Sequence, residues 1–344
     1  MLTNKGLVNN NMKLSVIISN RNDTAMLAVT IRSCIEEFKA INDKCEIVIV
    51  DNSDDGEVEV VKSVIPQHYI NEGVVKFIRQ DFPCLFTARD TAVENASGEY
   101  VVCLDSHMLC GRDMLVDMVT YMDSLKWNDK VGFGHAPISW AHQHERASRH
   151  DRDMSQHELG AWGTRYKNVR KITWKGMPWI CRREFFLSRE KGIGGYGALA
   201  KHRVSWGGGD MHIGIKPWLL GYENYAFPTS PGIHIGPFPK VDIAKGTKET
   251  IVRKKGDDSY KYRVYSSSGN FPHTFGFLVS CYVLGGEAMM NRNKEALTNR
   301  FGRYIRVDKW WDKAIELGQE EKDWLDANKV MSFEELLIKK PWEN

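Results

Sequence analysis

Short apolar runs alternate with helical patterns over the first hundred residues, and this alternation constrains the fold more than any other feature of the sequence. The apolar runs cover residues 14–19, 46–51, 74–78 and 100–104. Helical patterns fill the intervals, at about 24–40, 57–65 and 85–96. Strands that alternate with helices in this way are typical of βαβ units. We therefore predict an α/β fold with a mixed, mostly parallel central sheet flanked by helices.

Polar clusters follow three of the predicted strands, at residues 19–23, 51–55 and 105–107. Ligands of open α/β sheets bind beyond the carboxyl ends of the strands, so we expect these clusters to converge on one crevice. No GxGxxG follows the first strand and no GxxxxGK[ST] occurs, which excludes the usual signatures for binding phosphates with backbone amides. An acidic triplet at a strand end can instead hold a divalent cation that neutralises a diphosphate.

Asp105 and His107 form a candidate metal site within the third cluster. Residues i and i+2 of an extended segment project to the same side, so both side chains can face one ion. A carboxylate and an imidazole suit Mn²⁺ better than Mg²⁺, which prefers oxygen ligands. Taken alone, the Asp-x-His pattern also fits a simple turn at the end of a strand.

Two blocks of the sequence carry a family resemblance. The run from Ala88 to His107 resembles the donor-site signature of family 2 glycosyltransferases, and its Leu-Asp-Ser-His ending especially resembles the polypeptide N-acetylgalactosaminyltransferases. The second block, Trp206-Gly207-Gly208-Gly209-Asp210 followed by residues 218–222 and 234–236, is similar to the Trp-Gly-Gly-Glu block and later histidine of the same enzymes. The resemblance covers roughly residues 13–240 and implies the GT-A fold of nucleotide-sugar transferases.

The resemblance also implies roles for individual residues. The metal ligands are predicted to be Asp105, His107 and His234. The donor-binding residues are predicted to be Ser19, Asn20, Arg21, Asp51, Arg89 and Ser106. The acceptor-binding residues are predicted to be Trp206, Gly208, Gly209 and Trp179. The implied cofactors are a divalent cation, Mn²⁺ with Mg²⁺ as the alternative, and a nucleotide-sugar donor, for which we predict a UDP-sugar.

Asp210 is the predicted catalytic base. It stands where inverting relatives place a base, whereas the retaining N-acetylgalactosaminyl enzymes have an amide there, and only a carboxylate can accept the proton of an attacking hydroxyl. We therefore predict inversion, with retention as the alternative. The sequence departs from the family pattern at Gly209, where a Glu is usual, and at residues 81–84, a segment that is commonly basic in the N-acetylgalactosaminyl enzymes.

The acceptor is suggested by the charge of the middle of the chain. Residues 140–263 carry 23 Lys and Arg against 12 Asp and Glu, a net charge of +11 in a protein whose total is +3. Such a segment can bind a polyanion, or its charges can be dispersed over several faces of the fold. Basic and aromatic residues of the types that contact nucleic acid are interleaved at Arg146, Arg149, Arg152, Trp162, Arg165, Tyr166, Lys167, Arg170 and Lys171.

Three functions remain open on these grounds. The favoured acceptor is a 5-hydroxymethylpyrimidine in DNA, hydroxymethylcytosine or hydroxymethyluracil, as in phage DNA modification, and a duplex would have to extrude that base. A first alternative is a cytoplasmic family 2 enzyme that builds a glycan or polysaccharide. A second is a non-catalytic module that binds sugar or nucleic acid, although the candidate metal ligands and base are present.

The predicted domain organisation has three parts. Residues 1–240 form the catalytic domain, with a donor half at about 13–135 and an acceptor half at about 136–240. Residues 241–270 form a flexible basic loop, and residues 271–344 form a helical lobe in which Trp310, Trp311, Trp324 and Leu325 are packing residues. We see no secretory signal and no apolar stretch near twenty residues, so we expect a soluble cytoplasmic protein without stable membrane insertion, and we predict no protein partner.

Overall fold

The computed structural model describes residues 12–140, 152–153, 161–162, 177–204, 206–235, 271, 275–301 and 306–341. Within them the strands are β1 (Met12–Asn20), β2 (Lys44–Asp51), β3 (Val75–Arg79), β4 (Tyr100–Asp105), β5 (Met108–Cys110), β6 (Val131–His135), β7 (Ile138–Trp140), β8 (Arg152–Asp153), β9 (Ala161–Trp162), β10 (Trp179–Arg182), β11 (Glu223–Ala226) and β12 (Gly232–His234). The helices are α1 (Thr24–Phe38), α2 (Val58–Ser63), α3 (Gln67–Asn71), α4 (Leu85–Glu94), α5 (Met114–Ser124), α6 (Arg183–Leu187), α7 (Ala198–Lys201), α8 (Gly209–Leu219), α10 (Phe275–Phe301), α11 (Val307–Asn328) and α12 (Phe333–Lys339), with a 3-10 turn η1 (Asp55–Glu57).

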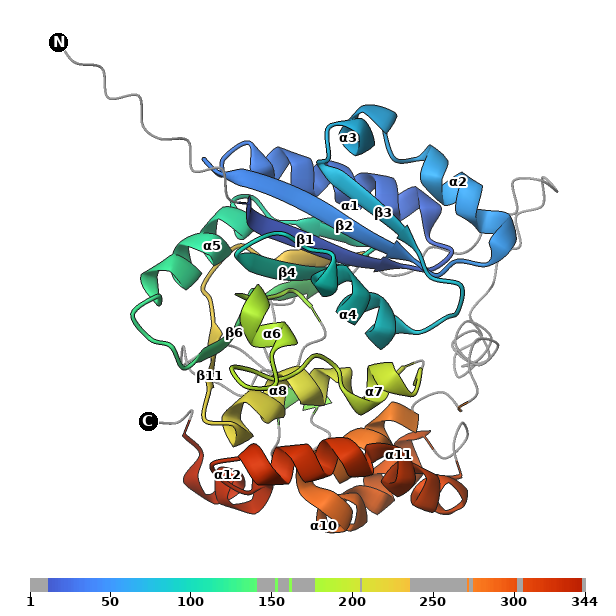
Figure 1. Cartoon of the computed structure of the whole chain (residues 1–344), viewed down its shortest axis with the longest axis vertical. Helices are drawn as coiled ribbons and strands as arrows, with labels where there is room; N and C mark the ends of the chain where they lie inside the picture. Colours follow the sequence, from blue (N-terminus) through green and yellow to red (C-terminus); the bar gives the residue numbers. More distant parts are fainter. Residues whose placement is uncertain are drawn as a thin grey trace.

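The described strands form a seven-stranded central sheet in the order β11-β6-β10-β4-β1-β2-β3. β4, β1, β2 and β3 run parallel, and β10 is antiparallel to both of its neighbours. The predicted α/β fold with a mixed, mostly parallel sheet is confirmed. Because β1 lies between β2 and β4, the carboxyl ends of these three strands meet at one edge of the sheet (Figure 1).

The elements of the first hundred residues follow the predicted pattern, and one helix was not predicted. All four strands and the helices α1 and α4 lie at the expected places. The pattern at 57–65 is a 3-10 turn followed by the short α2, and α3 comes next. α3 has five residues, which is too short for a hydrophobic period to show in the sequence.

The two faces of the sheet are covered by different helices. α1, α2 and α5 pack on one face, through residues such as Ile31, Val61 and Met118. α4, α6 and α8 pack on the other face, and the C-terminal helices α10, α11 and α12 pack beneath α8, so that α8 lies between the sheet and the C-terminal helices (Figure 1). Almost every residue of α8 is therefore buried.

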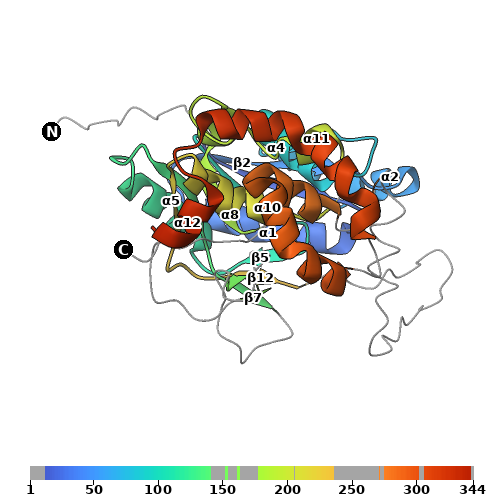
Figure 2. The ribbon, with the colours of Figure 1, turned by 90° about the horizontal axis from the view of Figure 1, so that it is seen from below.

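A second, three-stranded sheet lies beside α1, in the order β5-β12-β7 (Figure 2). β5 follows β4 directly after the Asp105-Ser106-His107 triplet, and β12 pairs with β5 in antiparallel register with His234 opposite Met108. The backbone N–H of Ile235 also donates to the carbonyl of His107, at 3.1 Å. This pairing joins segments more than a hundred residues apart and brings His234 to His107.

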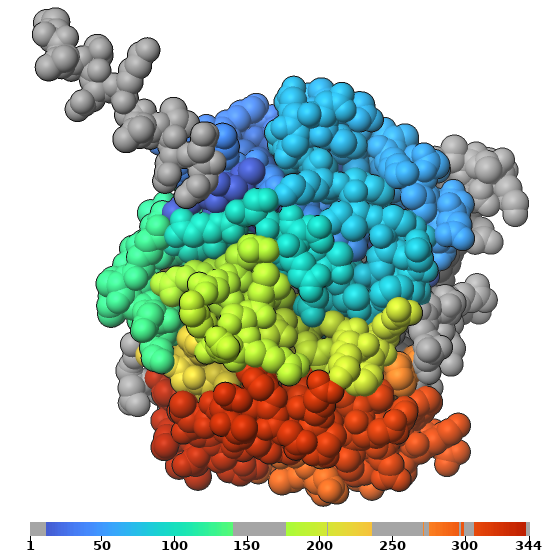
Figure 3. All heavy atoms as spheres, viewed as in Figure 1, coloured from blue at the N-terminus to red at the C-terminus, as the bar shows by residue number. Residues whose placement is uncertain are grey.

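The C-terminal helices form a continuous layer against the rest of the molecule (Figure 3). Leu325 is buried, and Trp310, Trp311 and Trp324 are partly buried against the same core, so these predicted packing residues are confirmed. Gly286, with φ at 65°, interrupts α10 and kinks it. Among the described helices, none combines the length and the apolar character that a membrane crossing requires.

His212, on α8, makes the stability of the protein sensitive to acid. Burial lowers the pKa of this imidazole to about 4, although Glu321 opposes the shift. The folded protein therefore keeps His212 neutral while the unfolded chain takes up a proton near pH 6.5, so stability is lost as the pH falls from about 6.5 to about 4. We expect His212→Gln to flatten this part of a plot of unfolding free energy against pH.

The control for this prediction is His68→Gln, because His68 is exposed on α3. Urea unfolding at several pH values would measure the unfolding free energy of both variants. An unchanged slope between pH 6.5 and 4 in His212→Gln would contradict the assignment.

Candidate active site

The register of the central strands brings the three polar clusters together. Asn20 of β1 is the Cα partner of Asp51 on β2, and Ser19 is the partner of Asp105 on β4. Neighbouring strands lie about 4.8 Å apart, so these residues share one edge of the sheet. The expected convergence of the clusters at the carboxyl edge is therefore observed.

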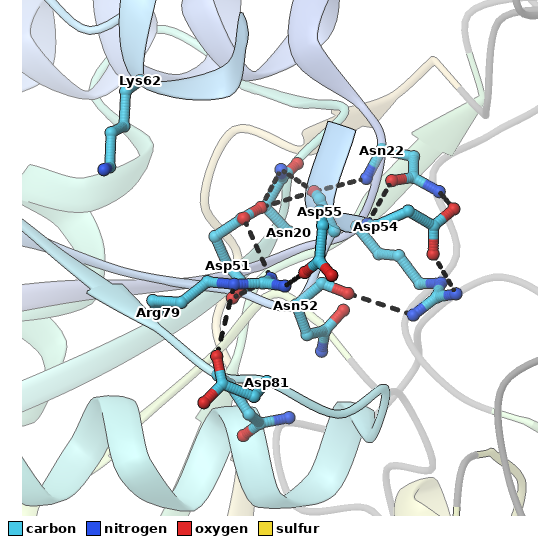
Figure 4. A network of polar contacts seen from close by, with 12 residues as sticks. Asn20, Asn22, Asp51, Asn52, Asp54, Asp55, Lys62, Arg79 and Asp81 are labelled. Carbon is cyan, nitrogen blue, oxygen red and sulfur yellow. Dashed lines mark hydrogen bonds and ion pairs between the residues drawn. The ribbon is translucent and has the colours of Figure 1, made fainter. Parts of the chain in front are cut away.

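A dense polar network occupies the β1 and β2 side of this edge (Figure 4). The Asn20 side-chain amide and the Ser53 hydroxyl donate to Oδ1 of Asp51, at 2.8 and 2.6 Å. Arg79 lies 3.5 Å from Oδ2 of Asp51 and 3.0 Å from Asp55. Asp51 is fully buried in this network, so its carboxylate is held rigidly at the strand end.

Two further predicted donor residues have distinct surroundings in this network. Arg21 donates to the carbonyl of Asn52, at 3.0 Å, and pairs with Asp54, at 2.9 Å, so its guanidinium ties the end of β1 to the segment after β2. The hydroxyl of Ser19 is buried and makes no hydrogen bond to any of the described residues. Such an atom needs a partner, and a ligand at the strand edge can supply one.

Asp105, His107 and His234 form a cluster of three metal-type ligands. Their ligand atoms all lie within 4.8 Å of one another. The two Nε2 atoms of the histidines are 3.2 Å apart, and Oδ2 of Asp105 lies 3.4 Å from His234 and 3.8 Å from His107. Two ligands at right angles, each about 2.1 Å from an ion, lie about 3 Å apart, so the cluster fits a single cation after small adjustments.

Asp23 orients His107 from behind. Its Oδ2 lies 2.7 Å from Nδ1 of His107 and also accepts from the hydroxyl of Ser106, at 3.2 Å. A carboxylate on Nδ1 holds the proton there and leaves the lone pair of Nε2 facing the cluster, which is the usual support of a metal-binding histidine. Burial opposes protonation of His107, but the bonds to Asp23 and Asp105 raise its pKa. The sequence placed Asp23 in a polar cluster without assigning it this contact.

Arg89 supports Asp105 in a similar way. The Arg89 side chain is 2% exposed and lies 3.2 Å from Oδ1 of Asp105 and 3.2 Å from the hydroxyl of Tyr196. Burial alone would raise the pKa of Asp105, but the contacts with His234, His107 and Arg89 lower it well below its ordinary value. The carboxylate of Asp105 is therefore ionised, and Arg89 lies behind it.

Asp210 stands in the first turn of α8, after a loop that depends on glycine. Gly208 has φ at 79°, and a Cβ there would overlap Ser280 and the backbone of Gly276 on α10. A Cβ on Gly209 would overlap the ring of Phe86, which explains why no Glu stands at this position. The backbone of this loop therefore packs directly against neighbouring residues, and this packing fixes the start of α8.

The charge of Asp210 reaches the surroundings of the metal-type cluster. Burial, and to a lesser extent Asp210, raises the pKa of Tyr196, and burial together with Asp105 and Asp210 raises the pKa of Cys103 to about 12. Cys103 lies two residues before Asp105 on β4, so its side chain is on the same face of the sheet as Asp105. Asp210 is thus close to the region behind Asp105.

The two predicted acceptor tryptophans differ in exposure. Trp206 is partly buried, and its ring meets Phe277 of α10 edge to face, with 5.9 Å between ring centroids. Trp179 has no exposed surface, because it packs between Phe133 and Phe186 in the core. The ring of Trp179 therefore offers no surface to an acceptor in this conformation. The predicted flexible loop, 241–270, lies outside the described residues, as do Arg146, Arg149, Arg165, Tyr166, Lys167, Arg170, Lys171 and the side chains of Arg152 and Trp162.

Comparison with known proteins finds a family match over the part of the chain that includes Asp105 and His107. Residues 15–175 match the family model described as glycosyl transferase family 2. This part of the chain is similar to family 2 glycosyltransferases. A search of curated proteins gave no match to this sequence.

One solved structure shares the fold over nearly the whole of this chain. A structure of GalNAc-T7 with UDP, GalNAc and Mn²⁺ has a TM-score of 0.63 and 16% sequence identity, and the alignment covers 96% of this chain and 57% of that chain. The protein thus spans 57% of the GalNAc-T7 chain. TarS from S. aureus has a TM-score of 0.46 and 16% identity, over 65% of this chain and 37% of that chain. The likeness to the GalNAc-T7 structure confirms the GT-A fold expected from the resemblance.

If the cluster binds a metal, removing the support of His107 should weaken that binding. We expect Asp23→Ala to lower Mn²⁺ affinity by about 10- to 100-fold, because His107 loses the partner that fixes its tautomer and ring orientation. Titration followed by the electron paramagnetic resonance signal of free Mn²⁺ would measure it. Asp43→Ala, at an exposed turn before β2, is the control and should bind Mn²⁺ as the wild type does. Equal affinities in the two variants would contradict the role of Asp23.

Proposed function

We propose that the protein transfers a sugar from a UDP-sugar to a hydroxyl acceptor in a metal-dependent, inverting reaction. The cluster of Asp105, His107 and His234 at the carboxyl edge of the sheet is the observation that carries this proposal. The buried network around Asp51 and the unsatisfied hydroxyl of Ser19 lie at the same edge and support it as the nucleoside side of the site.

The donor set fits a divalent cation, and we propose Mn²⁺. One carboxylate and two imidazoles suit this ion better than Mg²⁺. Asp23 and Arg89 leave Nε2 of His107 and the carboxylate of Asp105 available as ligands. A cation bound there would neutralise the charge that develops on the departing diphosphate. The presence of UDP and Mn²⁺ in the similar GalNAc-T7 structure supports both parts of the assignment.

Asp210 is proposed as the base. The N-terminus of α8 favours an ionised carboxylate, and a carboxylate can accept the proton of the acceptor hydroxyl as that oxygen attacks the sugar. Its position next to the glycine loop and near Tyr196 supports a place between donor and acceptor. Direct attack by the acceptor inverts the anomeric configuration of the sugar.

For the acceptor we propose a 5-hydroxymethylpyrimidine in DNA. The net charge of +11 between residues 140 and 263 supports a polyanionic acceptor, since Lys and Arg give salt-dependent affinity for phosphates. A glycan acceptor is the competing outcome of the experiment that follows.

A donor screen tests the proposal. Purified protein is incubated with a panel of nucleotide sugars and Mn²⁺ or EDTA, and nucleotide release is measured with hydroxymethylated duplex DNA, unmodified duplex of the same sequence, or no DNA. We expect Mn²⁺-dependent UDP release that the hydroxymethylated duplex stimulates about 10-fold or more. Release that is equal with both duplexes would overturn the DNA acceptor, and no release from any donor would overturn the transferase activity.

A further inference from the structure

One buried carboxylate of the C-terminal helices connects two elements of the proposed site. Glu321, on α11, is 2% exposed and pairs with Lys216 of α8, which is 1% exposed. His212, one turn earlier on α8, has its Nδ1 3.7 Å from the same carboxylate. Burial would raise the pKa of Glu321, but Lys216 lowers it, so the carboxylate is ionised.

The second oxygen of Glu321 holds a loop. Oε1 accepts from Lys216, while Oε2 accepts from the backbone N–H of Ala198 at the start of α7. Gly197, with φ at 51°, lies directly against the carboxylate, and a Cβ at this position would overlap it. The absence of a side chain at Gly197 therefore leaves room for the carboxylate of Glu321. The contact with Glu321 also restrains the residue before Gly197.

That residue is Tyr196, which is connected to the metal-type cluster through Arg89. Its hydroxyl lies 3.2 Å from Arg89, and Arg89 lies 3.2 Å from Asp105. Its backbone N–H donates to both oxygens of Asp90 on α4, at 3.1 and 3.2 Å. Asp90 and Glu321 thus hold the loop from opposite sides, and the loop sets where Arg89 and Asp105 lie.

Lys216 connects Glu321 to the proposed base, because both Lys216 and Asp210 belong to α8. It lies six residues after Asp210 on the same helix, a distance of about 9 Å along the helix axis. An α-helix of this length is stiff, so holding Lys216 also holds the start of α8 relative to the loop. The Lys216 ammonium additionally lies 4.9 Å from the centre of the Trp324 ring on α11.

We propose that Glu321 is a positioning residue of the transferase site: by binding Lys216 and Ala198 at once, it fixes the base side on α8 relative to the metal side at Tyr196, Arg89 and Asp105. This inference rests on the proposed function of the site. Glu321 touches neither donor nor acceptor. Through Glu321, the C-terminal helices contribute to the geometry of the proposed site.

The chemistry requires a carboxylate at this position. A glutamate accepts from two donors with its two oxygens, whereas a glutamine accepts with one oxygen and turns an NH₂ toward the other donor. Glu321→Gln therefore loses either the Lys216 contact or the Ala198 contact, and one of the two elements shifts. A displacement near 1 Å at a reacting group can cost about 100-fold in rate.

The test compares Glu321→Gln with Glu320→Gln. Glu320 is the next residue of α11, and its ion pair with Lys201 of α7 is exposed, which makes it a matched control. We expect Glu321→Gln to lower kcat by about 10- to 100-fold at a temperature well below its Tm, and to weaken Mn²⁺ affinity by about 3- to 10-fold. Glu320→Gln should keep both values within about 2-fold.

A purely structural role predicts a different result. In that case Glu321→Gln lowers Tm, but the protein that remains folded keeps wild-type kcat and wild-type Mn²⁺ affinity, and this result would overturn the proposal. Free Mn²⁺ measured by electron paramagnetic resonance gives the affinity independently of turnover. If the wild type neither binds Mn²⁺ nor releases nucleotide, the proposed function fails and this inference fails with it. An active wild type with an unaffected Glu321→Gln overturns this inference alone.

A second variant covers the case in which Glu321→Gln does not fold, because it leaves the Lys216 charge buried without its partner. Glu321→Gln combined with Lys216→Met removes that charge and frees the amide oxygen for Ala198. We expect this double variant to fold and to bind Mn²⁺ as the wild type does, with kcat lowered about 5- to 10-fold because α8 has lost its link to the loop. Wild-type kcat in the double variant would overturn the proposal.

Discussion

Asp105→Asn is expected to lower kcat by about 1000-fold and Mn²⁺ affinity by at least about 100-fold. Asp105 is the charged member of the three-ligand cluster, and its Oδ2 lies between the two histidines. An amide oxygen is a weaker, neutral ligand, so the cation is held less tightly and the charge on a departing diphosphate is less well neutralised.

The substitution also affects Arg89. The guanidinium is nearly fully buried and has Asp105 as its carboxylate partner, so Asp105→Asn leaves a buried charge poorly compensated. We therefore expect Tm to fall as well, and kinetics must be measured below the Tm of the variant. The control is Asp123→Asn, which removes a carboxylate that pairs with Lys13 and Lys126 at the other end of β4, by Tyr100. Mn²⁺ affinity within about 2-fold of wild type in Asp105→Asn would contradict the metal site.

The fold was predictable because its signal is local. Each strand of the first hundred residues is an apolar run of ordinary length, and each crossover is a helical pattern, so periodicity alone places β1, β2, β3 and β4. The convergence of the polar clusters follows from the same pattern, because parallel strands present their carboxyl ends at one edge.

The position of His234 required more than periodicity. It reaches His107 through the pairing of β12 with β5, which joins residues 232–234 with 108–110. Both strands have three residues, so neither gives a readable period, and only the family resemblance pointed to this histidine. The partners of individual side chains could not be predicted either. Nothing in the sequence indicated that Arg21 binds Asp54 or that Asp23 binds His107.

Packing explains the departure at Gly209. The sequence showed that the usual Glu is absent, but the reason is the ring of Phe86, which fills the space that a side chain would need. Phe86 belongs to α4 and lies more than a hundred residues away in the chain. A contact of that separation depends on how α4 and α8 pack against the same face of the sheet.

Asp210→Asn is expected to lower kcat by about 100- to 10,000-fold while KM for the donor and Mn²⁺ affinity stay near wild type. The amide keeps the size of the side chain and one acceptor oxygen but cannot take the proton of the acceptor hydroxyl. Because the proposed metal ligands and the network around Asp51 are unchanged, we expect donor binding to be retained and only the chemical step to slow.

A helix-matched control separates this role from a stability effect. Asp117 occupies the first turn of α5, a helix of the same length as α8, so Asp117→Asn removes the same favourable interaction with a helix N-terminus. Both variants should lose a similar, small amount of stability, and only Asp210→Asn should lose turnover. The anomeric configuration of the product, read by nuclear magnetic resonance, completes the test, because a base that activates the acceptor for direct attack requires inversion. A product that keeps the donor's configuration, together with near-normal kcat in Asp210→Asn, would show that Asp210 does not act as the base and that the sugar is transferred with retention.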